Sequence, residues 1–248
     1  MLLEQSSWPE IVSYLETSRG IILPIGSTEQ HGPTGLIGTD AICAEAVARG
    51  VGEASGALVA PTLAFGMAQH HLGFPGSVTL RPRTLIAMIC DIVHSLARQG
   101  FAKFYFLNGH GGNVATLSAA FSEIYAGQSL DPPRQGPAPC CRLRNWWQSR
   151  ELRQLVEELY GDAEGSHATP SEVALAAFAS AQALKRAPLD PAVATKKAGF
   201  TDAEDYRRAF PDGRIGSNPS LATAEDGRRL YEVAVKTATQ DYLAWLAQ

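Results

Sequence analysis

The chain has 248 residues, of which 45% are hydrophobic, and a formal net charge of −4 with a pI near 5.9. This apolar content can fill the core of one full-sized α/β domain, so we expect a single domain over residues 1–248. The weak negative charge provides no basic stripe for phosphates and argues against a nucleic-acid partner.

No apolar run in the sequence approaches the length of a membrane span, so we expect no membrane partner. The first residues, "MLLEQSSWPE", lack the basic and apolar regions of a signal peptide. The four cysteines show no CxxC spacing. A cytoplasmic protein with reduced thiols is the expectation.

Apolar runs alternate with amphipathic stretches along the chain, which is typical of strands joined by crossover helices. The predicted strands cover about 20–26, 57–63, 101–108 and 139–145. Helices are predicted over about 7–18, 40–54, 83–99, 113–127, 149–160, 170–184 and 220–247. The pattern indicates an α/β fold with a largely parallel sheet covered by helices.

Two stretches read as irregular connections. The segment 128–139 is rich in proline, and 187–219 is long and polar with little periodicity. A long loop in a compact domain is commonly functional, so 187–219 is a candidate active-site wall or subunit contact.

The stretch "PIGSTEQHGPTGLIGTD" holds the first group of candidate ligands, Glu29, His31 and Asp40. If the chain stays extended after its strand, Glu29 and His31 point the same way, because alternate residues share a face. Asp40 would return to them at the start of the next helix. The competing interpretation makes Glu29 and His31 solvated turn residues and Asp40 a helix cap.

His110 lies in the second group, "FYFLNGHGGNVATLSAAF", where an apolar strand ends and a helix begins. Ligands of parallel sheets collect at the carboxyl ends of strands. Gly111 and Gly112 allow close backbone approach and are candidates for substrate binding through their N–H groups. A phosphate loop is the alternative, but the stretch lacks the Lys-Ser/Thr ending and the dinucleotide spacing.

The third group, "GSHATPSEVALAAFA", places His167 before a helix and Glu172 one turn inside it. The same residues could be no more than a capping box. Of the other histidines, His94 falls within a helical pattern and is expected to be structural. One of His70 and His71, before "LGFPGSVTL", is expected to line the pocket, and we take His71 as the substrate-binding candidate.

Taken together, the three groups supply a mixture of imidazoles and carboxylates: His31, His110, His167, Glu29, Asp40 and Glu172. This mixture suits Zn²⁺, Mn²⁺ or another first-row divalent ion and excludes a thiolate site. Two ions about 3.5–4 Å apart, bridged by a carboxylate and a water, would use the whole set. A water with its pKa lowered toward neutrality would then be the nucleophile, as a hydroxide.

Six motifs in this order resemble those of the creatininase-like metal-dependent amidohydrolases: "PIGSTEQHGP", "GTD", "FPGS", "NGHGGN", "HATPSE" and "NPSLATAEDG". They span residues 24 to about 227. The resemblance implies a three-layer α/β/α sandwich and a homohexamer. It also implies two divalent metal ions per subunit, Zn²⁺ and/or Mn²⁺ with Fe²⁺ also compatible, that hydrolyse C–N bonds of cyclic amides or formamides.

Position by position, the resemblance assigns two ligand sets that share a bridging carboxylate: Glu29, Asp40 and His110 in one, and His31, Asp40 and Glu172 in the other. It places His167 near the scissile nitrogen, where it could bind substrate or pass a proton to the leaving amine. His167 and Glu172 are therefore the expected catalytic residues.

This chain departs from creatinine hydrolases of the family at three places: Gly111 and Gly112 replace a Tyr-Glu pair, Ala163 and Glu164 a Trp-Asp pair, and Ala68 a serine. The missing glutamate is a metal ligand in those enzymes, so Glu172 must replace it, as in the Gly-Gly branch of the family. Creatinine is therefore not the expected substrate.

The expected reaction is hydrolysis of a small amide, in which a metal-bridging hydroxide attacks and His167 protonates the departing nitrogen. Backbone N–H groups at Gly111 or Gly112 could stabilise the oxyanion. Three alternatives stay open: a creatinine hydrolase, a peptidase of this family that trims a modified precursor peptide, and a metal-free protein that binds phosphate over "NGHGGN". A serine hydrolase built on Ser27 is disfavoured because "GSTEQ" lacks the GxSxG elbow.

Overall fold

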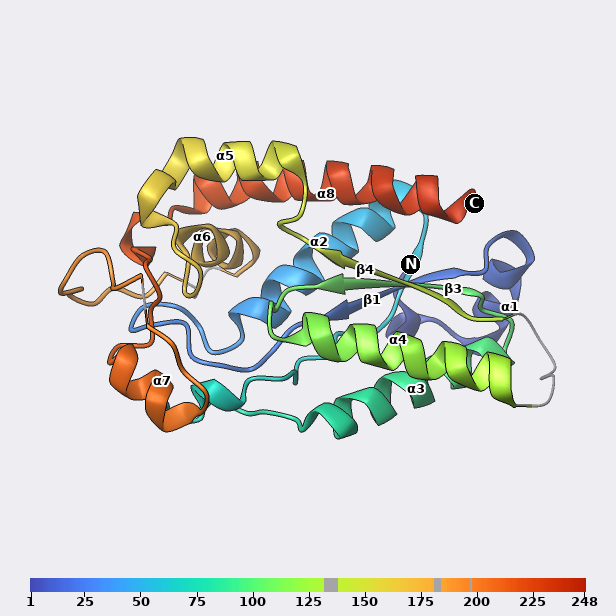
Figure 1. The fold of residues 1–248 in the computed structure, drawn as a ribbon. Helices are drawn as coiled ribbons and strands as arrows, with labels where there is room; N and C mark the ends of the chain where they lie inside the picture. The colour runs from blue at the N-terminus through green and yellow to red at the C-terminus, as the bar shows by residue number, and fades with distance from the viewer. Residues whose placement is uncertain (132–137, 181–183, 197) are drawn as a thin grey trace.

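The computed structural model describes residues 1–131, 138–180, 184–196 and 198–248 (Figure 1). Four parallel strands form one sheet in the order β2-β1-β3-β4. They are β1 (Gly20–Ile25), β2 (Leu58–Val59), β3 (Lys103–Asn108) and β4 (Cys140–Asn145). The register pairs Ile25 with Asn108 and Asn108 with Asn145, so three strands end level at one edge of the sheet.

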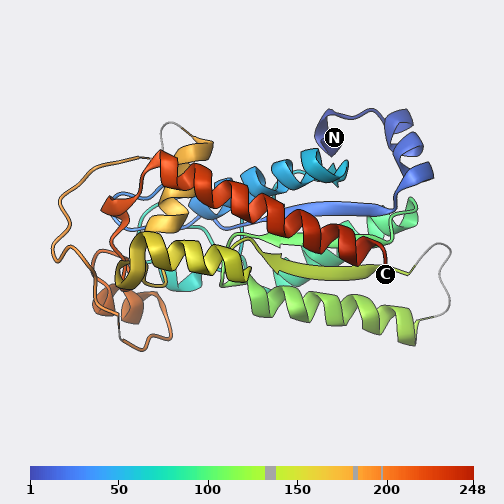
Figure 2. The same cartoon turned by 90° about the horizontal axis from the view of Figure 1, so that it is seen from above.

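Helices cover both faces of this sheet (Figure 1). They are α1 (Trp8–Thr17), α2 (Thr39–Ser55), α3 (Pro82–Arg98), α4 (Asn113–Leu130), α5 (Arg150–Tyr160), α6 (Pro170–Ala179), α7 (Ala203–Ala209) and α8 (Ala224–Leu246). Short 3-10 turns occur at Leu3–Gln5, Gln69–His71, Gly161–Ala163 and Pro219–Leu221. Helices α2, α5, α6 and α8 lie on one face and α3 and α4 on the other, and α8 crosses above the strands (Figure 2). The predicted three-layer α/β/α sandwich is confirmed.

Two hydrophobic cores flank the sheet because successive strand residues point to opposite faces. Ile22 of β1 packs in the core under α2, α6 and α8, whereas Ile21 and Leu23 pack in the core under α3 and α4. Every residue of β1 is buried. A continuous apolar run such as "GIILPI" is typical of a strand covered on both faces.

The second strand is shorter than predicted, with two residues in place of the expected 57–63. The Ala60 N–H donates to the carbonyl of Ile22 at 2.8 Å, but the next bond of the ladder would need an N–H at Pro24 of β1, which proline lacks. Backbone contact resumes at Leu63, whose N–H donates to the carbonyl of Pro24 at 2.9 Å. The segment therefore follows β1 without forming a regular strand.

Helix α7 was not predicted and lies within the stretch 187–219 that we expected to be irregular. Asp202 caps it by accepting hydrogen bonds from the N–H groups of Glu204 and Asp205, both at 2.9 Å. The predicted helix 170–184 ends earlier, at Ala179. Its expected last residues 181–183, and residues 132–137 of the expected proline-rich connection, lie outside the described residues.

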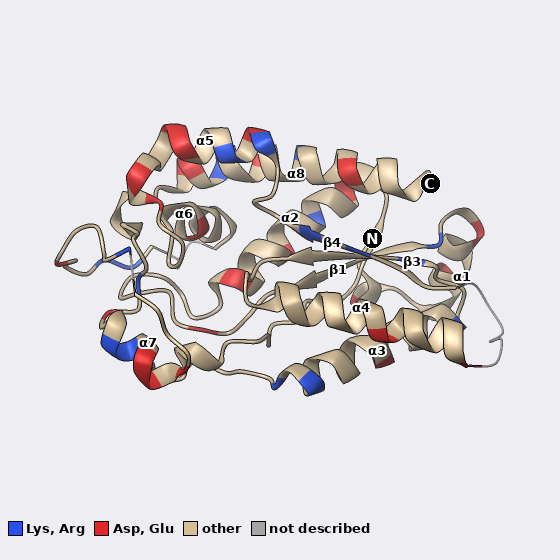
Figure 3. Ribbon diagram, in the orientation of Figure 1, with Lys and Arg blue, Asp and Glu red and all other residues tan. Residues whose placement is uncertain are grey.

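Among the described residues, no helix is both long and apolar enough to cross a membrane. Lys and Arg are interspersed with Asp and Glu on α5, α7 and α8 (Figure 3). Several form pairs, such as Arg208 with Asp205 and Arg229 with Glu158. These helices therefore present charges of both signs.

Candidate metal centre

Two glycines at the carboxyl ends of neighbouring strands bring the start of α2 against the sheet. A Cβ at Gly26 would lie 2.4 Å from the backbone nitrogen of Ala41, and one at Gly109 would lie 2.1 Å from the carbonyl oxygen of Asp40. Neither distance is possible for a real side chain. The glycines of "PIG" and "NGH" thus let Asp40 reach the ends of β1 and β3.

The first candidate group is buried, which argues against solvated turn residues. Glu29 is 0% exposed and His31 is 1% exposed. The Glu29 N–H donates to the carbonyl of Ile37 at 2.8 Å, and the Gly35 N–H donates to that of His31 at 3.0 Å, so the loop folds back on itself. Asp40 is the second residue of α2, after the N-cap Gly38 and Thr39, so it is not a cap.

Asp40 lies between two imidazoles. Its Oδ1 is 3.1 Å from His31 Nε2, and its Oδ2 is 3.1 Å from His110 Nδ1. The carboxylate thus contacts one histidine from the β1 loop and one from the β3 loop. This is the position expected of a bridging group.

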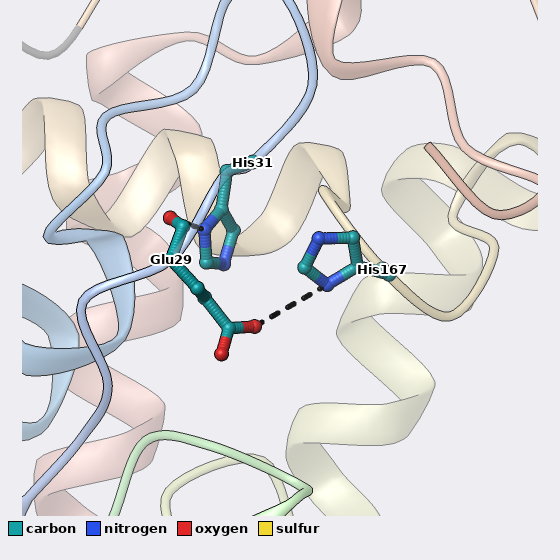
Figure 4. Close-up of side chains that lie close together, drawn as sticks. All are labelled: Glu29, His31 and His167. Carbon is teal, nitrogen blue, oxygen red and sulfur yellow. Dashed lines mark hydrogen bonds and ion pairs between the residues drawn. The ribbon is translucent and has the colours of Figure 1, made fainter. Parts of the chain in front are cut away.

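Glu29 faces three imidazoles. Its Oε2 lies 3.2 Å from His110 Nε2, while its Oε1 lies 3.2 Å from His71 Nε2 and 3.8 Å from His167 Nδ1. Figure 4 shows the Glu29 carboxylate pointing toward His167 beside His31. The His31 and His167 rings are 4.8 Å apart, so residues 136 positions apart in the first and third groups meet here.

Each of three imidazoles has one ring nitrogen against a backbone carbonyl. His31 Nδ1 is 3.1 Å from the carbonyl of Glu29, His110 Nε2 is 2.9 Å from that of Met67, and His167 Nε2 is 2.8 Å from that of Gln30. A nitrogen that donates to a carbonyl leaves the other nitrogen of a neutral ring unprotonated. That second nitrogen faces a carboxylate in all three cases, the arrangement of metal-binding histidines.

Glu172 caps its helix and also lies beside the other candidate ligands, so its position fits both interpretations from the sequence. Its Oε2 accepts hydrogen bonds from the Thr169 N–H at 3.0 Å and the Thr169 hydroxyl at 2.9 Å, which completes a capping box. The same carboxylate lies close to His31 and Asp40. Capping fixes the side chain at the edge of the cluster and does not exclude ligation.

The donors form three groups whose ligand atoms lie within 4.8 Å of one another: Glu29, Asp40 and His110; His31, Asp40 and Glu172; and Glu29, His31 and His167. The first two are the sets that the resemblance implies, and the third was not foreseen. Both carboxylate oxygens of Glu29 and Oδ2 of Asp40 are buried and accept no hydrogen bond from any described residue. Buried acceptors without donors fit a cation, so the donor set suits divalent metal ions.

The carboxylates also shift the protonation of the imidazoles. Burial lowers the pKa of His31, but Asp40 outweighs burial, with help from Glu172 and Glu29, and raises that pKa to about 10. Burial also lowers the pKa of His110, but the carboxylates of Glu29 and Asp40 outweigh burial and raise that pKa to about 9. Without a metal ion, protons on these rings balance the buried negative charge.

His167 and Asp40 shift in the opposite direction. Burial, together with the neighbouring rings of His31 and His71, holds the pKa of His167 well below its usual range. Burial would raise the pKa of Asp40, but the two adjacent imidazoles lower it overall. His167 is therefore neutral and Asp40 ionised at neutral pH.

The three substrate-binding candidates lie at different depths. His71 is 1% exposed, with its ring nitrogens against Glu29 and Gln30, whereas Gly111 is exposed. Gly112 is half-buried, and a Cβ there would lie 2.3 Å from His110 Nε2. A glutamate at this position would therefore displace His110. The substrate contacts of all three residues stay predictions.

Sequence reasoning missed the residues that close the cluster from the far side. The ring of Tyr206, on α7, lies edge-on to His71 at 4.7 Å. Arg214 is fully buried, and its guanidinium donates to the carbonyls of Ala192 and Pro191 at 2.7 and 2.8 Å. The segment 187–219 thus forms a wall of the cluster, and its role as a subunit contact stays a prediction.

Fold and site together define a three-layer α/β enzyme with a candidate metal centre at the carboxyl edge of a parallel sheet. The chain belongs to the creatininase family, because the family's sequence model, described as creatinine amidohydrolase, matches residues 4–241. It is a hydrolase that acts on carbon–nitrogen bonds.

Curated relatives carry more than one name. The mycofactocin precursor peptide peptidase of Mycobacterium tuberculosis is 29% identical over 245 residues, covering 94% of this chain and 88% of that protein. Its namesake from Mycolicibacterium smegmatis is 39% identical over 127 residues, which are 48% of this chain and 49% of that protein. The creatinine amidohydrolase of Pseudomonas putida is 37% identical over 117 residues, covering 43% and 45%.

Solved structures of creatininases share the fold over the whole chain. A mutant creatininase of type II superposes with a TM-score of 0.84 at 22% identity, covering 100% of this chain and 99% of that one. Related structures are described as a creatininase with Mn and as a mutant of Zn-Zn type. At these identities the likeness establishes the fold.

Proposed function

We propose that this chain is a metal-dependent amidohydrolase that binds two divalent cations. The observation that supports this most strongly is the arrangement of the imidazoles of His31, His110 and His167. Each lies with one nitrogen on a backbone carbonyl and the other on a buried carboxylate. A phosphate at this place would meet the buried carboxylates of Glu29 and Asp40, which would repel it.

Two ligand sets would hold the ions: Glu29, Asp40 and His110 for one, and His31, Asp40 and Glu172 for the other. Imidazole and carboxylate donors suit Zn²⁺, Mn²⁺ and Fe²⁺. When bound, such ions polarise a substrate carbonyl and lower the pKa of a water to near neutrality.

His167 is the residue best placed to move a proton. Its Nε2–H donates to the carbonyl of Gln30, so Nδ1 faces Glu29 with its lone pair. A neutral ring with a free Nδ1 would take the proton that the attacking water gives up and then deliver it to the departing nitrogen. This order adds a proton-accepting step to the expectation that His167 binds substrate or passes a proton to the leaving amine. Ala168, at φ 54°, turns the chain sharply between this ring and α6.

A small cyclic amide or formamide is the substrate class that we propose first. Creatinine itself is disfavoured, because Gly112, Ala68 and Ala163 stand where the resemblance places a glutamate, a serine and a tryptophan in creatinine hydrolases. A peptide substrate is the second candidate, supported by a peptidase relative that matches 94% of this chain. The homohexamer and the cytoplasmic location stay predictions.

The test is amine release from a panel of lactams, N-formyl amines, creatinine and short peptides. Protein stripped with a chelator should be inactive, and Zn²⁺ or Mn²⁺ should restore hydrolysis of at least one substrate. Asp40→Asn should not regain activity, since it weakens both ligand sets. Equal hydrolysis by stripped and reconstituted protein would refute the proposal.

A further inference from the structure

Gln30 stands between Glu29 and His31 in the sequence but serves a different set of partners. It is 4% exposed, so its amide must find hydrogen bonds within the protein. Its Oε1 accepts from the Gly32 N–H at 2.8 Å, and its Nε2 lies 3.0 Å from the carbonyl of Gly213. These contacts fix which end of the amide is oxygen and which is nitrogen.

The Nε2 group has two hydrogens and three acceptor candidates within 3.0 Å, while a fourth, the Tyr206 hydroxyl, lies farther away at 3.4 Å. Besides the carbonyl of Gly213, the closer candidates are His71 Nδ1 and His167 Nε2, both at 2.9 Å. His167 Nε2 also lies 2.8 Å from the Gln30 carbonyl, to which only a protonated nitrogen can donate. The two hydrogens therefore go to Gly213 and to His71 Nδ1.

This count determines the state of His71. A ring that accepts at Nδ1 carries its proton on Nε2. That Nε2 lies 3.2 Å from Glu29 Oε1, so the positive end of its N–H dipole faces a buried carboxylate. The Gln30 amide thus orients His71, and His71 in turn supports Glu29.

The Gln30 amide also connects His71 and Glu29 to the segment around Tyr206 and Gly213, which forms a wall of the cluster. A Cβ at Gly213, where φ is +86°, would lie 2.0 Å from Gln30 Oε1. The Tyr206 hydroxyl donates to the same Gly213 carbonyl at 2.8 Å, and the Tyr206 ring packs on His71. Position 213 must therefore be glycine for the amide to keep its place.

We propose that Gln30 is a positioning residue of the metal centre. Its side chain holds His71 in the Nε2–H form against Glu29, and it links the segment around Tyr206 and Gly213 to the ligands. The inference rests on the proposed metal centre. Outer partners of ligands typically contribute about 10- to 100-fold to metal affinity. We expect an effect of that size from Gln30 although it touches no metal.

Two variants and two controls test this. Gln30→Met removes the amide at similar volume, and Gly213→Ala displaces it from outside. Gln69→Met, at an exposed position two residues before His71, and Gly199→Ala, with no atom within 4 Å of a new Cβ, are the matched controls. Metal affinity is measured by competition with a chelator, and melting confirms that each variant folds.

The decisive readout is the tautomer of each histidine in the metal-free protein, from long-range ¹⁵N–¹H spectra. In Gln30→Met, His71 should lose its single Nε2–H form and Zn²⁺ affinity should fall about 10- to 100-fold. His167 should keep its form, because its acceptor is a backbone carbonyl that every variant retains. Both controls should match the parent chain.

An unchanged His71 tautomer and unchanged Zn²⁺ affinity in a folded Gln30→Met would overturn the inference. A Gln30→Met variant in which His71 and His167 both lose their single tautomeric form would also overturn the inference, since that pattern indicates general disorder of the site. If the parent chain binds no metal, the proposed function fails instead, and the His71 spectrum still tests the role of Gln30.

Discussion

Metal binding to this cluster should depend steeply on pH, because two ligands hold protons that the ions must displace. The pKa of His31 is raised to about 10 and that of His110 to about 9. Both rings are therefore protonated in the metal-free protein at neutral pH. Asp40 is already ionised, because its pKa is lowered, and releases nothing.

The size of the pH dependence follows from the displacement of one histidine proton by each ion. Below about pH 9, the apparent affinity for each ion should rise about tenfold per pH unit, or about 100-fold from pH 6 to pH 8. Asp40→Asn removes a charge that raises both pKa values, so its slope should become shallower as neutral pH is approached.

Calorimetry in buffers of different ionisation enthalpy counts the released protons directly, and competition with a chelator of known pH dependence gives the affinity. We expect at least one proton per ion, and at least two in total, at pH 7, because His31 and His110 each lose one and burial also raises the pKa of Glu172. Release of no proton, with an affinity that is flat between pH 6 and pH 8, would refute the assignment of His31 and His110 as ligands.

Three substitutions test other parts of the site. Glu172→Gln should lower the metal content from about two ions to about one, measured by elemental analysis, and an unchanged content would exclude Glu172 as a ligand. Gly112→Ala should weaken metal binding at least tenfold, because its Cβ would lie 2.3 Å from His110 Nε2, whereas Gly111→Ala, with nothing within 4 Å, should not. Arg214→Met should lower the free energy of unfolding by about 3 kcal/mol, because it leaves the carbonyls of Pro191 and Ala192 and the half-buried carboxylate of Asp212 without their donor. A urea midpoint equal to the parent's would contradict that role.

Local patterns were sufficient for most of the fold. The alternation of apolar runs and amphipathic stretches predicts all four strands, and the full burial of "GIILPI" reflects helices on both faces. Helix α7 escaped because seven residues give little periodicity, although the Asp202 cap followed by acidic residues is a start signal. The length of strand β2 was overestimated because apolar content does not reveal that the ladder between β1 and β2 ends at Pro24, which has no N–H.

Some residues of the candidate site could be predicted from local sequence patterns, and others could not. Candidate ligands could be found because histidine and carboxylate recur at the ends of strands and the start of helices. Gln30 and Tyr206 could not, since their roles depend on contacts with residues up to 183 positions away. Spacing also could not decide between cap and ligand at Glu172, because the carboxylate that caps α6 also lies close to His31 and Asp40.

The measurement that tests the central claim most directly is the metal content of the purified chain, compared with that of Asp40→Asn, together with amide hydrolysis by the same samples. The two-ion account predicts about two divalent ions per parent chain, a large loss in the variant, and hydrolysis that follows the metal content. A parent chain that binds no Zn²⁺ or Mn²⁺, or that hydrolyses an amide equally well without them, would contradict it.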